Sequence, residues 1–223
     1  MPYAGVEMHA ATLQPEREIV FVVDDDASML AAIRRVLISA NYEVEGYASG
    51  AALLEDARLD HPQCLLLDML MPGMSGLEVQ AALNQRQVRV PIIFITGHAE
   101  VPIAVEAMRQ GAFDFIEKPF GNDDLIVRVR RAIRMSRQRQ QQALLREDAL
   151  LKLTSLTPRE TEVLQLIVSG KTSKEVARAL GGSHRTVDIH RGRIMKKTAT
   201  STLAGLVRLC AAADEGIRVG LDT

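Results

Sequence analysis

Short apolar runs alternate with stretches of helical periodicity along the first half of the chain. The runs are rich in Val, Ile, Leu and Phe, and most end at Asp, Thr, Lys or Gly. Apolar runs of this length are typical of strands buried on both faces of a parallel sheet. The predicted strands lie at residues 19–23, 42–46, 64–67, 91–95 and 113–116. Because helical stretches separate them, the pattern predicts an α/β doubly wound domain with a five-stranded parallel sheet.

The helices of this half follow from apolar residues spaced three or four positions apart. They are predicted at residues 29–41, 49–58, 75–85 and 101–110, with a further helix that begins behind Asn122. No Gly or Pro occurs from Asn122 to Thr157, and Leu125 and Val129 keep the helical spacing. We therefore expect the last helix of the first domain to continue through residues 125–155 as a helical linker.

Residues 156–214 carry a different pattern, in which four short amphipathic helices are separated by turns. Thr157 and Glu160 form a capping box around Pro158 at the start of the first helix. The same box recurs before the second helix, and two glycines precede a third helix that Ser183 caps. These signals predict a small all-α helix-turn-helix domain. On their own they leave open a helical dimerisation module as the alternative.

The net charge of −1 conceals an uneven distribution of charge. Residues 17–124 carry 17 acidic and 8 basic side chains, a balance of −9. Residues 125–156 carry 2 acids and 8 bases (+6), and residues 157–223 carry 7 acids and 11 bases (+4). An acidic domain followed by a basic one favours nucleic acid as a partner of the second. The linker arginines are interpreted mainly as a solvated face, with contacts to DNA or to the acidic domain as alternatives.

Both ends of the chain lack a regular period. Residues 1–16 are predicted to form a disordered N-terminal arm, and residues 215–223 a C-terminal tail. The chain shows no signal-peptide pattern and no apolar run of membrane-spanning length. Cys64 and Cys210 lie far apart in apolar surroundings, which favours reduced thiols. We therefore expect a cytoplasmic protein with no membrane association.

The predicted strands end in a distinctive set of polar residues. Asp24 and Asp25 follow the first strand, Asp68 the third, Thr96 the fourth and Lys118 the fifth. The carboxyl ends of parallel strands meet at one edge of a sheet, where open α/β sheets bind ligands. Clustered carboxylates favour a hard cation such as Mg²⁺, and a carboxylate can act as a nucleophile towards a phosphoryl group. The alternative for Asp68 alone is that it caps the turn after its strand.

Four motifs surround these strand ends: Val-Val-Asp-Asp (22–25), Leu-Asp-Met-Leu-Met-Pro-Gly-Met-Ser-Gly (67–76), Ile-Thr-Gly-His (95–98) and Lys-Pro-Phe (118–120). With them, the domain at 17–124 resembles the flavodoxin-like receiver domain of bacterial two-component response regulators. The resemblance implies that Asp68 is the phosphoacceptor. It also implies that Asp24, Asp25, Asp68 and the Leu70 backbone carbonyl bind Mg²⁺. Asp26 is a third neighbouring acid, and the 43-residue spacing from Asp25 to Asp68 favours Asp24 and Asp25 as the pair.

The same resemblance assigns the parts of a switch. Thr96 and Lys118 would contact the phosphoryl oxygens, Phe115 would change rotamer, and the Lys118–Pro119 bond would be cis. Residues 97–109 are particularly similar to the FixJ branch of the family, in which the fourth helix and fifth strand form a dimer face on phosphorylation. Val105 and Arg109 occupy matching positions. Without the resemblance, Val105 would be interpreted as a core residue and Arg109 as a solvated one.

The second domain contains Leu-Thr-Pro-Arg-Glu-Thr-Glu-Val-Leu (156–164), Lys-Glu-Val-Ala (174–177), Arg-Thr-Val-Asp-Ile-His-Arg (185–191) and Arg-Ile-Met-Lys-Lys (193–197). These runs resemble the LuxR-type domain that closes FixJ and NarL regulators. The resemblance implies that residues 183–197 form the recognition helix in the major groove. The DNA-binding residues it implies are Lys174, Ser183, Arg185, Thr186, Asp188, Ile189, His190, Arg191, Arg193 and Lys197. Lys174, Thr186, His190 and Lys197 would hold phosphates, while Asp188, Ile189 and Gly192 occupy base-facing positions.

The sequence thus predicts a response regulator transcription factor rather than an enzyme. A sensor histidine kinase would phosphorylate Asp68 with Mg²⁺, and the protein would form a homodimer on promoter DNA, with RNA polymerase as a further candidate partner. One alternative is a constitutive DNA-binding regulator whose receiver is only a dimerisation scaffold. Another is a Mg²⁺-dependent phosphatase with Asp68 as nucleophile. Such enzymes usually carry a general acid two residues further on, where this chain has Leu70.

Overall fold

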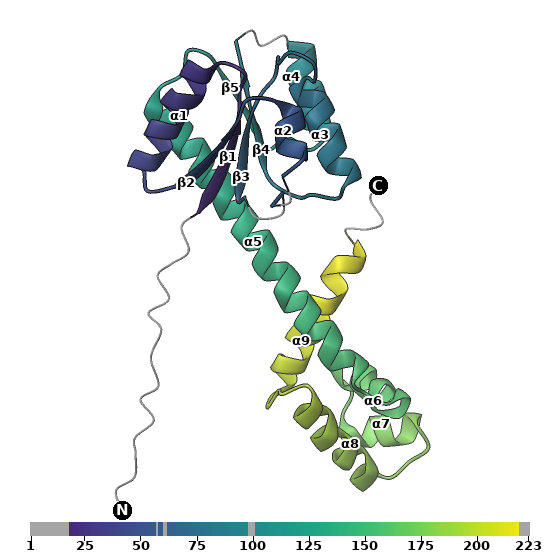
Figure 1. Ribbon diagram of the computed structural model, residues 1–223. Helices are drawn as coiled ribbons and strands as arrows, with labels where there is room; N and C mark the ends of the chain where they lie inside the picture. The colour runs from purple at the N-terminus through teal and green to yellow at the C-terminus, as the bar shows by residue number, and fades with distance from the viewer. Residues whose placement is uncertain (1–17, 57, 60–61, 98–100, 219–223) are drawn as a thin grey trace, which may run out of the picture. The chain divides into compact units, whose positions relative to one another are not determined.

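The computed structural model describes residues 18–56, 58–59, 62–97 and 101–218 (Figure 1). The chain divides into two compact units, residues 1–137 and 138–223. The predicted N-terminal arm and residues 219–223 of the predicted tail lie outside the described residues. Residues 215–218 of that tail belong instead to the last helix.

The first unit is built on a five-stranded parallel sheet. Its strands are β1 (Ile19–Val23), β2 (Glu43–Tyr47), β3 (Cys64–Asp68), β4 (Ile92–Thr96) and β5 (Asp114–Glu117). The strand order is β2-β1-β3-β4-β5, and every neighbouring pair is parallel. The chain winds from β1 to one side and then continues from β3 to the other. The boundary between β1 and β3 is therefore the switch point at which such sheets bind ligands. The predicted fold class is confirmed.

Helices cover both faces of this sheet. Helices α1 (Ala27–Ser39) and α5 (Asn122–Thr154) lie on one face, and α2 (Gly50–Leu54), α3 (Gly76–Gln85) and α4 (Val101–Arg109) lie on the other (Figure 1). Side chains of β1 alternate between the two layers: Val20 and Val22 join the α1/α5 core, and Phe21 and Val23 join the opposite one. Because both faces are packed, the strand reads as a continuous apolar run rather than an alternating one.

Helix α2 is shorter than the sequence pattern predicts. The prediction placed it from residue 49 to about 58, whereas it ends at Leu54. The Asp56 carboxylate accepts the backbone N–H of Arg58 at 2.7 Å and the Tyr47 hydroxyl at 2.7 Å. An Asp that bonds backbone two residues ahead forms a turn that competes with the helix. Hydrogen bonds from the Arg58 side chain, followed by the one from the Tyr47 hydroxyl, hold the pKa of the Asp56 carboxyl below its usual range.

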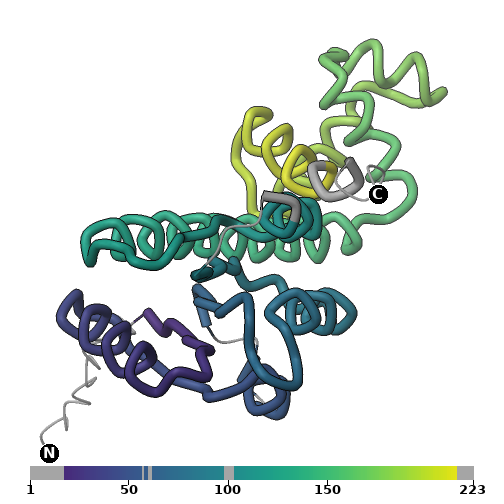
Figure 2. The backbone as a smooth tube through the Cα atoms, turned by 90° about the horizontal axis from the view of Figure 1, so that it is seen from above, coloured from purple at the N-terminus to yellow at the C-terminus, as the bar shows by residue number. Residues whose placement is uncertain are grey.

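Helix α5 is one continuous helix from Asn122 to Thr154 (Figure 2). Its first part belongs to the sheet core, because Leu125, Val129, Ala132 and Ile133 are all buried against it. From residue 138 to 148 every side chain is exposed. The predicted linker at 125–155 thus contains a packed receiver segment followed by a solvated one.

The second unit forms four helices after α5: α6 (Pro158–Val168), α7 (Ser173–Ala179), α8 (His184–Lys197) and α9 (Leu203–Arg218). Both predicted capping boxes are present, with Thr157 and Thr172 as N-caps. The Ser183 hydroxyl caps α8 by accepting the Thr186 N–H at 3.1 Å. A separate core, which includes Val163 and Ile194, holds these helices together. The caps define where α6, α7 and α8 start, and the core sets which face of α8 remains in solvent.

Candidate functional site

The strand ends bring three carboxylates together at the switch point. Asp24 directly follows β1, Asp68 ends the neighbouring strand β3, and Asp25 continues the turn after β1. One carboxylate oxygen of each acid lies within 4.8 Å of the others. Asp24 is 0% exposed and Asp68 is 7% exposed, whereas Asp25 is exposed, so the cluster reaches the surface through Asp25.

Lys118, just beyond β5, supplies positive charge to the edge of the sheet where Asp24, Asp25 and Asp68 lie, which we call the rim. Its Nζ lies 3.0 Å from Oδ2 of Asp24 and 3.4 Å from Oδ2 of Asp68. The remaining oxygen of each carboxylate accepts a backbone N–H, from Asp26 to Asp24 and from Met69 to Asp68, both at 2.9 Å. The two buried carboxylates are therefore fixed in orientation, with one cation between them.

The electrostatics of the rim favour a further positive group. Burial raises the pKa of Asp68, the Lys118 charge opposes that rise, and the Asp24 charge adds to it. Desolvation by itself lowers the pKa of Lys118, but the hydrogen bond to Asp24 and the Asp68 charge outweigh it, so its pKa is raised. The single positive charge of Lys118 thus does not neutralise the two carboxylates of Asp24 and Asp68. A hard cation bound by oxygen ligands fits this donor set.

The structure separates Asp26 from the candidate metal ligands. The Asp26 carboxylate accepts the N–H groups of Ser28 at 2.8 Å and Met29 at 3.3 Å, and so forms the N-cap of α1. Its backbone N–H also orients Asp24. The geometry therefore agrees with the pair Asp24 and Asp25 that the spacing favoured.

Other predicted members of the receiver site lie around the rim. Thr96, at the end of β4, is 3% exposed. Phe115 on β5 is 39% exposed, and the side chain of Leu70 is 66% exposed beside the acid cluster. The Lys118–Pro119 bond is cis, as the resemblance implied. The structure thus brings the strand-end residues together and leaves Phe115 facing solvent.

Gly76 allows the chain to pass close to the carboxyl end of β3. Its backbone N–H donates to the Met69 carbonyl at 3.0 Å, at the start of α3. A Cβ at this position would overlap the backbone carbonyl oxygen of Asp68 and lie 2.9 Å from a ring carbon of Phe94. The structure therefore requires a residue without a side chain at this position.

Gly76→Ala is expected to destabilise the first unit by about 1–3 kcal/mol, because the new methyl group must push on backbone rather than on a flexible side chain. Denaturant unfolding of the whole protein measures this. Gly121→Ala is a matched control, since a Cβ there meets nothing within 4 Å. Because Gly121 lies at the N-cap of α5, where Ala is less favourable than Gly, the free energy of unfolding of this variant should fall by less than about 1 kcal/mol. Equal stability of the two variants would show that the backbone at the end of β3 shifts to accommodate the methyl group.

The predicted dimer face is exposed in this structure. Val105 on α4 is 46% exposed, and Arg109 at the end of the same helix is also exposed. Residues 98–100 of the FixJ-like stretch lie outside the described residues. Helix α4 is tied to α3 by Gln80, whose buried amide donates to the Ala107 carbonyl at 3.1 Å. The exposed positions leave room for a partner, as the dimer prediction requires.

Helix α8 presents a largely basic, solvent-exposed surface. Val187 and Ile194 face the core, and the opposite side is open. The predicted DNA-binding residues that are exposed are Lys174, Ser183, Arg185, Thr186, Asp188, Ile189, Arg193 and Lys197. His190 and Arg191 are partly buried, and the Arg191 guanidinium donates to the Ser173 hydroxyl at 3.3 Å. Most of the predicted set therefore lies where DNA could reach it.

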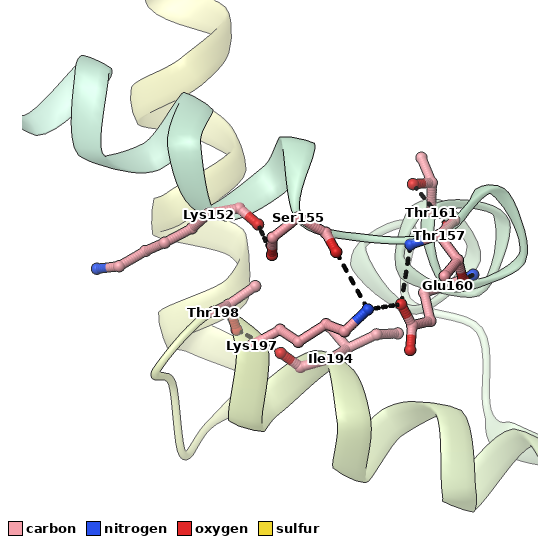
Figure 3. A network of polar contacts seen from close by, with 8 residues as sticks. All are labelled: Lys152, Ser155, Thr157, Glu160, Thr161, Ile194, Lys197 and Thr198. Atoms are coloured by element: carbon pink, nitrogen blue, oxygen red, sulfur yellow. Dashed lines mark hydrogen bonds and ion pairs between the residues drawn. The ribbon is translucent and has the colours of Figure 1, made fainter.

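The ammonium group of Lys197, a predicted DNA-binding residue, is bound by acceptors within the second unit. Its Nζ donates to Oε2 of Glu160 at 2.7 Å and to the Ser155 carbonyl at 3.1 Å (Figure 3). Glu160, which is 2% exposed, also accepts the Thr157 N–H at 2.9 Å. These contacts join the segment after α5, the start of α6 and the end of α8. The predicted phosphate contact of Lys197 thus competes with an ion pair that ties the end of α8 to the start of α6.

This ion pair makes the second unit sensitive to acid. The hydrogen bond from Lys197, followed by that from the Thr157 backbone, lowers the pKa of Glu160 from 4.5 to about 2. Because the pKa is lower in the folded state, the contribution to stability is complete above 4.5 and is lost as the pH falls towards 2. We expect the Tm of this unit in calorimetry to fall over that interval. Glu160→Gln should flatten the dependence, and an unchanged slope would contradict it.

Two family models match this chain, one in each unit. The model described as the response regulator receiver domain matches residues 20–130, and the model described as bacterial regulatory proteins of the luxR family matches residues 154–210. Nodulation protein W of Bradyrhizobium diazoefficiens is 38% identical over 86% of this chain and 85% of its own length. The chain is a response regulator with a LuxR-type DNA-binding domain.

Other similarities support the same family. The transcriptional regulatory protein FixJ of Bradyrhizobium diazoefficiens is 35% identical over 85% of this response regulator and 93% of its own length. The solved structure of the response regulator StyR superposes with a TM-score of 0.77 at 39% identity, and it covers 87% of this chain and 98% of that one. The receiver implies a histidine kinase as partner, and the LuxR-type domain implies DNA binding.

The response regulator also contains features that the sequence pattern did not single out. Nδ1 of His184 lies 3.2 Å from the Asp188 carboxylate on α8, and a search for partners at i, i+4 around Asp188 would have found this pair. The close approach at Gly76 had no local signal, because it depends on how the chain returns to the carboxyl end of β3. Among the described residues, none of the helices has the length and apolar character needed to cross a membrane.

Proposed function

We propose that this response regulator is switched by phosphorylation of Asp68, with Asp24, Asp25, Asp68 and the Leu70 carbonyl as ligands of Mg²⁺. The observation that carries the proposal is the carboxylate cluster at the β1/β3 switch point with Lys118 beside it. A turn-capping role for Asp68 does not account for two buried acids that share one ammonium. Bound Mg²⁺ would supply charge neutralisation for the incoming phosphoryl group.

The residues of the rim have separate roles in this proposal. Oδ2 of Asp68 attacks the phosphorus of a phosphohistidine donor, so that a P–O bond forms as the P–N bond breaks. The Met69 N–H holds Oδ1 and leaves Oδ2 directed towards Lys118. The Lys118 ammonium then stabilises the charge on the transferred phosphoryl oxygens. Thr96, at the end of the adjacent strand β4, donates its hydroxyl to one of those oxygens.

Phosphorylation acts on DNA binding through the dimeric state. The new charge and acceptor oxygens draw Thr96 inward, and Phe115, which is exposed in this structure, moves with it. This rearrangement favours pairing through α4 and β5 at Val105 and Arg109. Two LuxR-type domains then bind promoter DNA with recognition helices about one helical turn apart. Phosphorylation has an effect only if the phosphoryl group interacts differently with the two states.

Light scattering and DNA binding of the intact protein test this proposal together. With Mg²⁺ and beryllofluoride, a phosphoryl mimic, we expect the mass to change from monomer to dimer and the affinity for promoter DNA to rise by about tenfold or more. Omission of Mg²⁺ should remove both effects. Equal mass and equal affinity under all conditions would overturn the switch and leave the constitutive regulator. Hydrolytic turnover of added phosphoesters would instead indicate a phosphatase.

A further inference from the structure

Helix α8 carries a single acidic residue among many basic ones. Asp188 is the only acid from His184 to Lys197, a segment that also contains Arg185, Arg193 and Lys196. Its side chain is 50% exposed, on the part of the helix that does not face the core. A carboxylate on a helix that enters the major groove is repelled by the phosphates. It is favourable there only if it accepts a hydrogen bond from a base.

The imidazole of His184 lies next to this carboxylate. Nδ1 of His184 lies 3.2 Å from Oδ2 of Asp188, one helical turn further along. Both side chains are open to solvent, so this neighbour does not bury the Asp188 carboxylate. His184 is thus placed to hold Oδ2 and to leave Oδ1 as an acceptor. Gly192 follows one turn later, and nothing lies within 4 Å of where its Cβ would be, so the helix surface beyond Asp188 is bare.

A single carboxylate acceptor distinguishes the bases in the major groove. Cytosine presents an N4 amino donor with no acceptor beside it, whereas guanine presents two acceptors there and thymine one. Adenine presents an amino donor next to the N7 acceptor, which would repel the carboxylate. Cytosine is therefore the base that the Asp188 carboxylate binds best. The acceptor groups of guanine and thymine repel the carboxylate.

We propose that Asp188 reads a cytosine in each half-site of the operator and that His184 is a positioning residue for it. This inference rests on the proposed DNA-binding function and deepens it, since it names the base that one residue selects. Discrimination by one such contact is worth about tenfold or more between cytosine and the next base. His184 contributes by holding Oδ2, and it contacts no base itself.

Selection from a pool of random-sequence DNA duplexes tests the inference on the whole protein with Mg²⁺ and beryllofluoride. The wild type is expected to enrich a two-fold site with one strongly preferred cytosine in each half. Asp188→Asn should change that position to adenine, because an Asn amide pairs with the adenine N6 and N7 groups. Asp188→Ala should lose the preference by about tenfold and bind non-operator DNA more tightly, since one negative charge is gone.

The positioning role of His184 has its own readout. His184→Ala should reduce the preference for cytosine by roughly threefold while affinity for non-operator DNA stays constant, and His184→Gln should retain it because an amide can still donate to Asp188. Glu162→Gln on α6 removes a carboxylate outside α8 and should leave the base preference unchanged. If Asp188→Asn and Asp188→Ala select the wild-type site, the inference is overturned and DNA binding stands. If the wild type enriches no sequence, the proposed function fails as well.

Discussion

Replacing Asp68 with Asn is expected to abolish phosphorylation of the protein and every change in mass and DNA affinity that depends on it. Asn keeps the shape of the side chain, but its amide oxygen is no nucleophile and it carries no charge for a cation. The carboxylate pair would also lose half of its charge beside Lys118. Incorporation of labelled phosphoryl groups from a small-molecule donor, with Mg²⁺, measures the first effect directly, and we expect it to fall below about 1% of wild type.

Asp26→Asn is the matched control for this variant. It makes the same chemical change two residues from Asp24, in a carboxylate that serves as the N-cap of α1. Asn caps a helix about as well as Asp, so stability and phosphorylation should remain close to wild type. If Asp68→Asn is still phosphorylated, the phosphoacceptor must be another acid of the rim. Loss of phosphorylation in both variants would show that Asp26 belongs to the site, against its position in this structure.

The topology of the first unit could be predicted because each signal was local. An apolar run long enough for a buried strand, followed by a polar end, recurs four times, and right-handed parallel connections then leave few arrangements. The rim followed from this, since parallel strands deliver Asp24, Asp68 and Lys118 to one edge wherever they lie along the chain. The end of α2 was predicted too late, because the turn from Asp56 to Arg58 is held in addition by the Tyr47 hydroxyl, which comes from β2.

The second unit shows where sequence reasoning has to stop. Capping boxes are local, and both were predicted correctly at Thr157 and Thr172. The partner of Lys197 is 37 residues away, and nothing in the spacing distinguishes a lysine that faces DNA from one that faces Glu160. The family resemblance places Lys197 on the surface that faces DNA. The direction of its long, flexible side chain, however, depends on which acceptor is nearby.

The pairing of Lys197 with Glu160 therefore makes a prediction that opposes a phosphate role. Lys197→Met is expected to lower the Tm of the second unit by roughly 10 °C, because it leaves the carboxylate of Glu160, 2% exposed, without its counter-charge. The protein has no Trp, and its three Tyr precede residue 48, so intrinsic fluorescence does not report on this unit. Calorimetry of the intact protein resolves its transition instead.

Two further variants separate the structural role from a DNA contact. Lys196→Met removes the neighbouring exposed lysine and should leave the Tm unchanged. The double variant Glu160→Gln with Lys197→Met should recover part of the lost stability, because the uncompensated charge is gone.

The salt dependence of DNA binding tests whether Lys197 contacts a phosphate. The loss of one phosphate contact reduces the slope of log K against log salt by about 0.9. We expect Lys197→Met to keep the wild-type slope, because its ammonium is bound to Glu160 and Ser155. A reduced slope with an unchanged Tm would return Lys197 to the DNA interface and leave Thr157 as the principal partner of Glu160.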